Sequence, residues 1–292
     1  MFSFMDGFSG YNQINIVPVD QHKTAFIYPW GTFAYKKLPF GLKNAGATFQ
    51  RAMSYDFHDI CHIVQPYLDD LPAHSVKRQD HPIHLRDIFL RCRHYHIRLN
   101  PHKCVFCVES GRLLRFIVSR EGIRLDPLKV KAIVNLPPPA SLQQLQSLQG
   151  KSNFLRQFVP NYAKVAKGFT RLLKCDVPFH WDAIAQESFE RLKGLLVSAP
   201  LFRPLNYHRD YTLYLVAADT TIGMVLVQMD DDDIEHVIYY LSRNLLDMET
   251  RYAYVEKLAL AVVCSVQRFR HYILLRATTV VFDCNPMMYI LS

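Results

Sequence analysis

IVQPYLDD, residues 63–70, is the most informative stretch of this 292-residue sequence, because an apolar run ends there in two adjacent carboxylates, Asp69 and Asp70. The apolar part predicts a strand that turns around these two residues. Paired carboxylates beside a buried strand cost free energy unless a cation compensates their charge, and hard oxygen ligands suit Mg²⁺. By itself, the pair is also typical of a solvated hairpin turn. A metal site therefore needs a further carboxylate from elsewhere in the chain.

Asp6 is a candidate for that third carboxylate. It ends another short apolar run, at residues 2–5, and two neighbouring strands that end side by side would present Asp6 and Asp69 to one pair of metal ions. Two divalent ions about 4 Å apart activate an attacking hydroxyl and stabilise a leaving oxygen. The three carboxylates together predict a two-metal site of the kind that catalyses phosphoryl transfer.

Three successive motifs resemble reverse transcriptases of gypsy-class LTR retrotransposons. They are FSFMDGFSGYNQI at residues 2–14, LPFGLKNA at 38–45 with TFQ at 48–50, and YLDD at 67–70. LNPHKC at 99–104, the region after PPP at 137–139, and YYLSR at 239–243 look like downstream parts of the same family, so the resemblance covers essentially the whole chain. Residues 235–242 and 268–275 look plant-like. The chain thus resembles a reverse transcriptase/RNase H fragment of a retrotransposon polyprotein that lacks the upstream fingers.

This resemblance implies an RNA-directed DNA polymerase that uses Mg²⁺, with Asp6, Asp69 and Asp70 as the catalytic, metal-binding carboxylates. Tyr11 would be the sugar gate, because its ring would exclude the 2′-hydroxyl that distinguishes ribose from deoxyribose. The implied substrate-binding residues are Tyr11, Phe40, Gly41 and Tyr67. The implied partners are an RNA template, a DNA primer, the RNA/DNA hybrid, deoxynucleoside triphosphates and other parts of the polyprotein.

The pattern of apolar residues predicts an α+β fold in three parts. Residues 1–121 alternate short strands with helices at about 45–60 and from 82, which by resemblance is a polymerase palm with truncated fingers. Residues 122–207 contain a capping-box helix start at Ser141 and Gln144 and predict a helical thumb or connection. Residues 208–292 have a βββαβ order and resemble an RNase-H-like α/β domain that is truncated at its C-terminal end.

The RNase-H-like part departs from its family's acidic cluster. Glu256 and Asp283 match two of the acids, but the first falls on Val216, which cannot bind Mg²⁺. Asp219 would point to the opposite face of the strand from Val216. We therefore expect the nuclease to be inactive.

Two departures affect the polymerase part. Pro72 follows Leu71 and removes a hydrogen-bond donor from a strand, so the hairpin around Asp69 and Asp70 is expected to be distorted. Arg115 stands where the family usually has a glycine in the strand that grips the primer. Its side chain would intrude where the backbone should approach the primer.

Composition limits the function classes. With 50% hydrophobic and 21% charged residues, the chain is a globular protein and not a disordered one. It has no apolar run of about 18 residues and no signal-like leader, so we expect no membrane span and an intracellular location. Residues 122–207 carry 12 Lys and Arg against 5 Asp and Glu, whereas residues 208–292 carry 7 against 11. A basic middle segment suits a polyanion, although solvated helix faces give the same pattern.

Two other functions fit parts of the sequence. A catalytically dead retroelement remnant would still bind RNA/DNA hybrid through residues 122–207. A zinc-binding module would use imidazole and thiolate ligands from one cluster, which comprises His94, His96, His102, Cys104 and Cys107.

Overall fold

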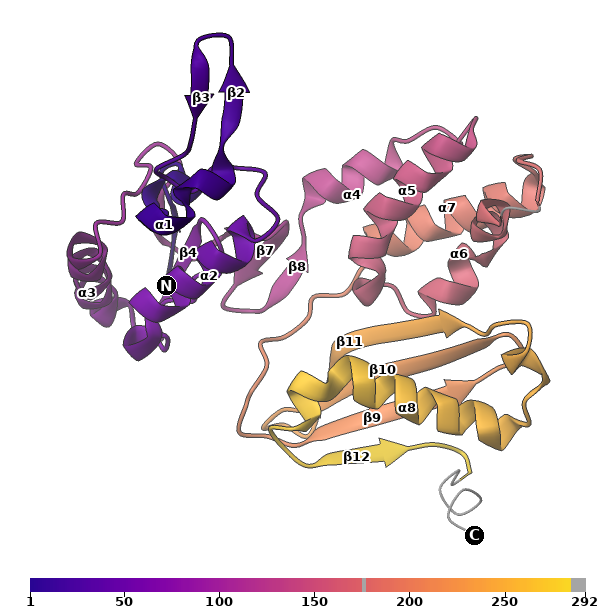
Figure 1. Cartoon of the computed structure of the whole chain (residues 1–292). Coiled ribbons are helices and arrows are strands. Elements are labelled where there is room, and N and C mark those ends of the chain that lie inside the picture. Colours follow the sequence, from indigo (N-terminus) through magenta and orange to yellow (C-terminus); the bar gives the residue numbers. More distant parts are fainter. Residues whose placement is uncertain (175–176, 285–292) are drawn as a thin grey trace. The chain divides into compact units, whose positions relative to one another are not determined.

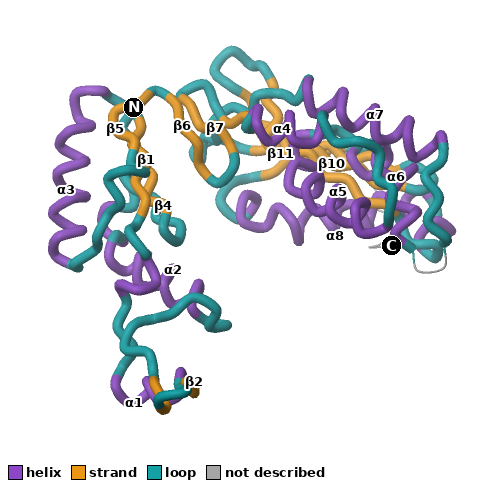
Figure 2. Tube along the Cα trace, turned by 90° about the horizontal axis from the view of Figure 1, so that it is seen from above, coloured by secondary structure: helices purple, strands orange, loops and turns teal. Residues whose placement is uncertain are grey.

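The computed structural model describes residues 1–174 and 177–284, and it divides into two compact units, Met1–Arg120 and Glu121–Ser292. The division lies next to the predicted boundary after residue 121, whereas the predicted boundary after residue 207 falls inside the second unit. The predicted class, with mixed helices and antiparallel strands, is confirmed. Each unit is drawn in Figures 1 and 2.

The first unit is built on a three-stranded antiparallel sheet in the order β4-β1-β5, with bounds Asp70–His74, Phe2–Asp6 and Val105–Val108. Helices α2 (Ala45–Asp56) and α3 (His81–His94) lie beside this sheet in both views (Figures 1 and 2). Phe49 and Met53 of α2 and Ile88 of α3 share one buried core with Met5 and Leu71 of the strands. The sheet therefore has a solid apolar support where β1 ends and β4 begins.

Smaller elements complete this unit. Strands β2 (Phe26–Tyr28) and β3 (Gly31–Phe33) form an exposed hairpin, and β6 (Ser110–Leu113) pairs with β7 (Phe116–Ser119). The short helices are η1 (Gly10–Gln13), α1 (Pro18–Gln21), η2 (His22–Thr24), η3 (His58–Ile60) and η4 (Arg78–Asp80). The sequence pattern predicted short strands and no helix before about residue 45, so the three short helices between Gly10 and Thr24 are a correction.

The second unit contains a helical region and a four-stranded sheet. The helical region comprises α4 (Pro127–Val134), α5 (Leu142–Leu155), η5 (Arg156–Phe158), α6 (Tyr162–Thr170), η6 (Arg171–Leu173) and α7 (Ala183–Val197), preceded by the short strand β8 (Ile123–Leu125). The side chains of Ser141 and Asp182 cap α5 and α7 by accepting hydrogen bonds from backbone N–H groups of the first turn. The predicted helix start at Ser141 is therefore confirmed.

The sheet has the order β11-β10-β9-β12, with bounds Glu235–Asn244, Thr221–Met229, Tyr211–Ala217 and Thr278–Val281. Only β12 is parallel to its neighbour β9. Helix α8 (Tyr254–Ile273) follows η7 (Glu249–Arg251) and covers one face of the sheet (Figure 1), where Leu258 and Phe269 are fully buried. This arrangement agrees with the predicted βββαβ order.

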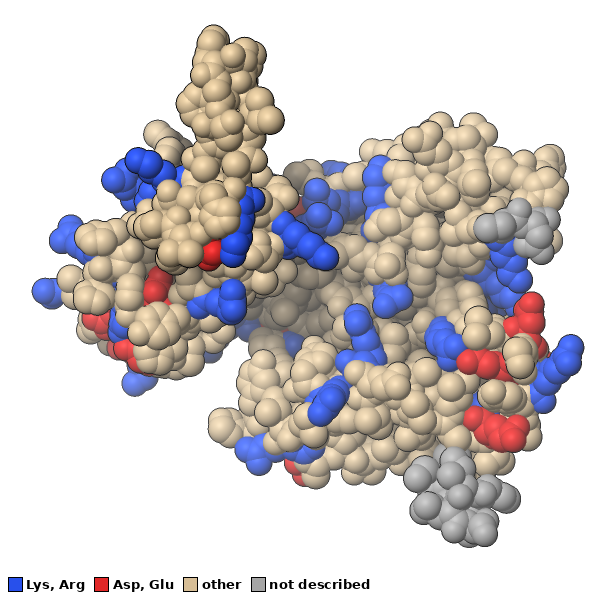
Figure 3. All heavy atoms as spheres, viewed as in Figure 1, with Lys and Arg blue, Asp and Glu red and all other residues tan. Residues whose placement is uncertain are grey.

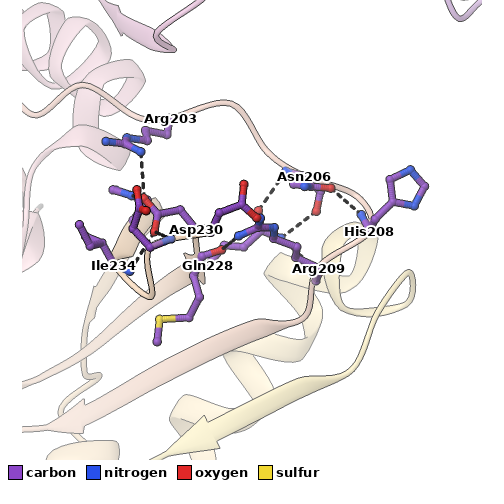
Figure 4. A network of polar contacts seen from close by, with 11 residues as sticks. Arg203, Asn206, His208, Arg209, Gln228, Asp230 and Ile234 are labelled. Carbon is purple, nitrogen blue, oxygen red and sulfur yellow. Dashed lines mark hydrogen bonds and ion pairs between the residues drawn. The ribbon is translucent and has the colours of Figure 1, made fainter.

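The segment that joins the helical region to the sheet is fixed by polar contacts (Figure 4). The buried Gln228 amide accepts a hydrogen bond from the Asn206 N–H at 2.9 Å and donates to the carbonyls of Asn206 and Arg209. Arg203 pairs with Asp230 at 3.0 Å. The connection is therefore an ordered part of the second unit and not a free linker.

Candidate active site

The end of the central sheet in the first unit brings the three predicted carboxylates together. Asp6, the last residue of β1, lies directly opposite Asp70, the first residue of β4. Asp69 precedes β4 in a tight turn, where the Gly7 N–H donates a 2.8 Å hydrogen bond to the Asp69 carbonyl. The end of β1 thus lies beside the start of the antiparallel β4, so the carboxylates meet although the second apolar run does not form the strand that was expected to end there.

The predicted strand at 63–68 is wrong in extent. Only Val64 and Tyr67 form isolated bridges, to Ala73 and Asp70, and the continuous strand begins at Asp70. Pro66 explains the interruption, because proline has no N–H to donate to a ladder. The hairpin itself is closed, since Tyr67 and Asp70 exchange backbone hydrogen bonds of 2.8 and 3.0 Å.

Pro72 does not disturb the pairing of β4 with β1, which is continuous over all five residues. The N–H and C=O groups of a strand residue point to the same side, and the Pro72 carbonyl accepts from the Gln65 N–H at 3.1 Å. The missing donor therefore faces Gln65 and not β1. The expected distortion is confined to the outer side of the hairpin.

Gln50 on α2 anchors this hairpin, a role that the sequence analysis missed. Its side-chain oxygen accepts from the Leu68 N–H at 2.7 Å, and its amide nitrogen donates to the Pro66 carbonyl at 3.0 Å. Leu68 has a φ of 51°, a conformation that non-glycine residues adopt at a cost of about 1 kcal/mol or more. The Gln50 contacts offset that cost and fix the position of Asp69.

The carboxylates repel one another in a partly buried setting. Burial raises the pKa of the Asp69 carboxyl, as do the charges of Asp6 and Asp70, while Lys103 opposes the shift. The pKa of Asp70 is raised by burial and then by Asp6. The Lys103 ammonium lies 3.3 Å from Asp6 Oδ1, and Asp69 Oδ1 is buried without a hydrogen-bond partner. Lys103 was not predicted, although it lies in the quoted LNPHKC motif.

A divalent cation would suit this donor set, because it would bind the unpaired Asp69 oxygen and reduce the repulsion. However, the side chains of Asp6, Asp69 and Asp70 are not grouped closely enough to hold a metal ion in this structure. Within residues 1–174 and 177–284, no three His, Cys, Asp or Glu side chains are grouped so that they could hold a metal ion. The same finding means that His94, His96, His102, Cys104 and Cys107 do not form the zinc cluster considered above.

Tyr11 and Phe40 are brought into contact near the carboxylates. The Tyr11 ring lies edge-on to Phe40, with centroids 4.7 Å apart, and 5.1 Å from the buried Phe49 ring. Gly41 has a φ of 98°, which favours glycine over residues with a side chain. Phe40 and Tyr67 are exposed, at 68% and 51%. Tyr11 is thus held by two rings, while Phe40 and Tyr67 are free to meet a ligand.

The β6–β7 hairpin turns at Leu114 and Arg115, whose φ angles of 48° and 74° are both positive. A two-residue turn of this kind favours glycine, so Arg115 adopts a conformation that suits glycine better. Arg115 is also the residue that stands where the family usually has a glycine.

The residues predicted for RNase H activity lie around the start of α8. Glu256 accepts a 2.8 Å hydrogen bond from the Ala253 N–H, and the Tyr254 hydroxyl donates to Asp283 at 3.1 Å. The Val216 side chain is 51% exposed on β9, and Asp219 lies beyond the end of that strand. In this arrangement Glu256 caps its helix, and Val216 leaves an apolar group where an acid was expected.

No helix in the described part of the chain is long and apolar enough to cross a membrane. Lys and Arg side chains are spread over the face of each unit drawn in Figure 3 and outnumber the acidic ones there.

Residues 1–133 match the family model of reverse transcriptase (RNA-dependent DNA polymerase), and residues 181–280 match that of the RNase H-like domain found in reverse transcriptase. The retrovirus-related Pol polyproteins from transposons opus and 297 of Drosophila melanogaster are 33% and 32% identical over 100% and 99% of this chain. The chain spans only 30% and 27% of their lengths. A foamy viral protease-reverse transcriptase in complex with RNA/DNA hybrid has the same fold, with a TM-score of 0.87 and 21% identity over 96% of this chain and 38% of that one.

Proposed function

We propose that this chain catalyses RNA-templated DNA synthesis. It contains a reverse transcriptase domain and an RNase H-like domain. The observation that carries the proposal is the meeting of Asp6, Asp69 and Asp70 at one end of a sheet, with a buried carboxylate oxygen left unpaired. The chemistry is transfer of a nucleotide to a primer. The primer 3′-hydroxyl forms a bond to the α-phosphorus of a deoxynucleoside triphosphate, and pyrophosphate leaves.

Asp6, Asp69 and Asp70 would hold two Mg²⁺ ions. When bound, these ions would activate the attacking hydroxyl and stabilise the charge that develops on the leaving oxygen. The chain's own contribution is positioning: Gln50 and the Gly7 N–H fix the Asp69 turn, and the unpaired Asp69 oxygen is ready to accept a cation. Tyr11, held between Phe40 and Phe49, supplies a rigid wall against a 2′-hydroxyl.

We further propose an RNA template, a DNA primer, the RNA/DNA hybrid and deoxynucleoside triphosphates as partners, together with other parts of a polyprotein. The motifs quoted above support a gypsy-class element, and residues 235–242 and 268–275 support a plant-like one. We also propose an intracellular location. Val216 supports an RNase H-like domain without nuclease activity, because valine offers no oxygen ligand in place of the first acid.

Mg²⁺-dependent primer extension on an RNA template tests the polymerase proposal. Asp69→Asn should lower the extension rate at least about 100-fold, because several kcal/mol of transition-state stabilisation are lost. Asp87→Asn, on the exposed face of α3, should leave the rate unchanged. Equal rates in wild type and Asp69→Asn would contradict the proposal.

Two observations favour the alternative of a hybrid-binding remnant. Asp6 already forms an ion pair with Lys103, and within the described residues the three carboxylates do not form a group that could hold a metal ion. If the wild-type chain binds RNA/DNA hybrid in a salt-dependent manner but adds no nucleotide with Mg²⁺, the chain is a hybrid-binding remnant and the polymerase proposal is wrong.

A further inference from the structure

A pocket of 780 Å³ in the first unit has a lining that begins at Phe8, two residues after Asp6, and contains none of the residues assigned to the site above. It is lined by segments 8–15 and 92–98 together with Lys37. Its volume falls in the range of sites that hold small molecules. All of its lining residues belong to the described part of the chain, and none of them is Asp or Glu.

The pocket has a strong excess of positive charge. Lys37, Arg93 and Arg98 line it and are exposed, and none of the three forms an ion pair within residues 1–174 and 177–284. Three unpaired cations around one hollow repel each other, so an anion that enters relieves the repulsion as well as forming charge-assisted hydrogen bonds. Arginine forks match the geometry of phosphate oxygens in particular.

The wall that carries Arg98 is held rigidly by Gln13. The Gln13 amide donates to the carbonyls of Phe8 at 2.6 Å and Arg98 at 3.0 Å, and its oxygen accepts from the Arg98 N–H at 2.7 Å. Carbonyl groups at the end of α3 are also engaged, because those of Arg91 and Cys92 accept from the N–H groups of Tyr95 and Ile97. These hydrogen bonds fix the walls of the pocket before any ligand binds. The Arg91 and Cys92 carbonyls already have backbone partners.

The strand register relates the pocket to the carboxylates. Gly7 pairs with Leu99 in an antiparallel bridge, so Phe8 lies opposite Arg98 and Asp6 lies opposite Asn100. Residues opposite one another share a face, as do residues two apart along a strand. Asp6 and Arg98 therefore lie on the same face, about 7 Å apart along the strand.

We propose that this pocket binds an oligophosphate, with Lys37, Arg93 and Arg98 as its ligands. The proposal rests on the proposed function for the identity of the ligand, which is either the triphosphate tail of the incoming nucleotide or the pyrophosphate that leaves. The chain therefore supplies cations for these phosphates from the first unit itself.

Isothermal titration calorimetry with inorganic tripolyphosphate, without Mg²⁺, tests the site separately from catalysis. The double variant Arg93→Gln/Arg98→Gln should bind tripolyphosphate at least about 10-fold more weakly, because charge-assisted hydrogen bonds are lost. Arg86→Gln, exposed on α3 outside the pocket, is the matched control and should bind like wild type. Equal losses in both variants would show non-specific attraction and would overturn the proposal.

Further titrations identify the source of the phosphates. A larger loss for deoxythymidine triphosphate than for pyrophosphate assigns the pocket to the incoming nucleotide, and the reverse assigns it to the released product. If the double variant weakens binding of RNA/DNA hybrid but not of tripolyphosphate, the pocket contacts a nucleic-acid backbone and the proposal is wrong. The wild-type chain could bind tripolyphosphate, lose that binding in the double variant, and still show no primer extension. That result would support the phosphate pocket and refute only the proposed polymerase activity.

Discussion

His81 offers the sharpest test of how the first unit is held together. Its imidazole is 1% exposed at the start of α3, with Nε2 2.7 Å from Ser3 Oγ and Nδ1 2.8 Å from Ser75 Oγ. Ser3 lies on β1 and Ser75 directly follows β4, so one ring joins a helix to both strands that carry the carboxylates. Ser3 Oγ also accepts from the Cys107 N–H at 3.0 Å, and Ser75 Oγ also contacts His84 Nδ1 at 2.7 Å.

His81→Ala removes two buried hydrogen bonds while each serine hydroxyl keeps one other partner. At about 1 to 1.5 kcal/mol for each bond, the free energy of unfolding of the first unit should fall by about 2 to 3 kcal/mol. Urea unfolding, followed by circular dichroism and by hydrogen exchange of β1 and β4 amides, measures this loss. His94→Ala, exposed on the same helix, should change stability by less than about 0.5 kcal/mol. A loss for His81→Ala no greater than that of the control would refute the reasoning.

The same residue predicts a pH dependence. Burial lowers the pKa of His81 below its ordinary value of 6.5, and so do the charges of the N-terminus, His84 and His74. The unfolded chain therefore takes up a proton first as the pH falls through about 6.5, and the free energy of unfolding decreases. His81→Ala should weaken this decrease between pH 7.5 and 5.5, and His74, whose pKa is also lowered, should account for part of what remains. An unchanged pH dependence in the variant would contradict the assignment.

Three further predictions concern the second unit. Gly122→Ala should destabilise it by about 1 to 3 kcal/mol in urea unfolding, because φ is +144° and a Cβ would lie 2.0 Å from the Phe202 carbonyl oxygen. Gln228→Ala should cost about 2 to 3 kcal/mol by the same measurement, since it leaves buried partners without hydrogen bonds. A hydrogen bond from His236, together with backbone N–H donors, lowers the pKa of Asp230 to about 2. The stabilising effect of the ionised Asp230 is thus present above pH 3.8 and is lost towards pH 2. Asp230→Asn should remove that part of the dependence of the thermal unfolding midpoint on acid pH.

Local patterns were sufficient for much of the secondary structure. The apolar run that ends at Asp6 predicts the end of β1, and Ser141 and Asp182 mark helix starts, because periodicity and capping depend on residues only a few positions apart. The pattern failed where two local signals conflicted. Residues 63–68 are apolar enough for a strand, but Pro66 cannot donate to its ladder, so the strand is reduced to two bridges.

The sequence by itself determined which three carboxylates to consider and the order of the elements that carry them. Each carboxylate lies within a short continuous motif, so no tertiary information is needed to find it. Only the tertiary structure decided what surrounds them. Lys103 reaches Asp6 across 97 positions, Gln50 holds the turn before Asp69, and Arg98 comes to lie on the face of Asp6. These contacts depend on which strands become neighbours and in what register. Register is set by burial of the whole apolar core, and no local period of the sequence encodes it.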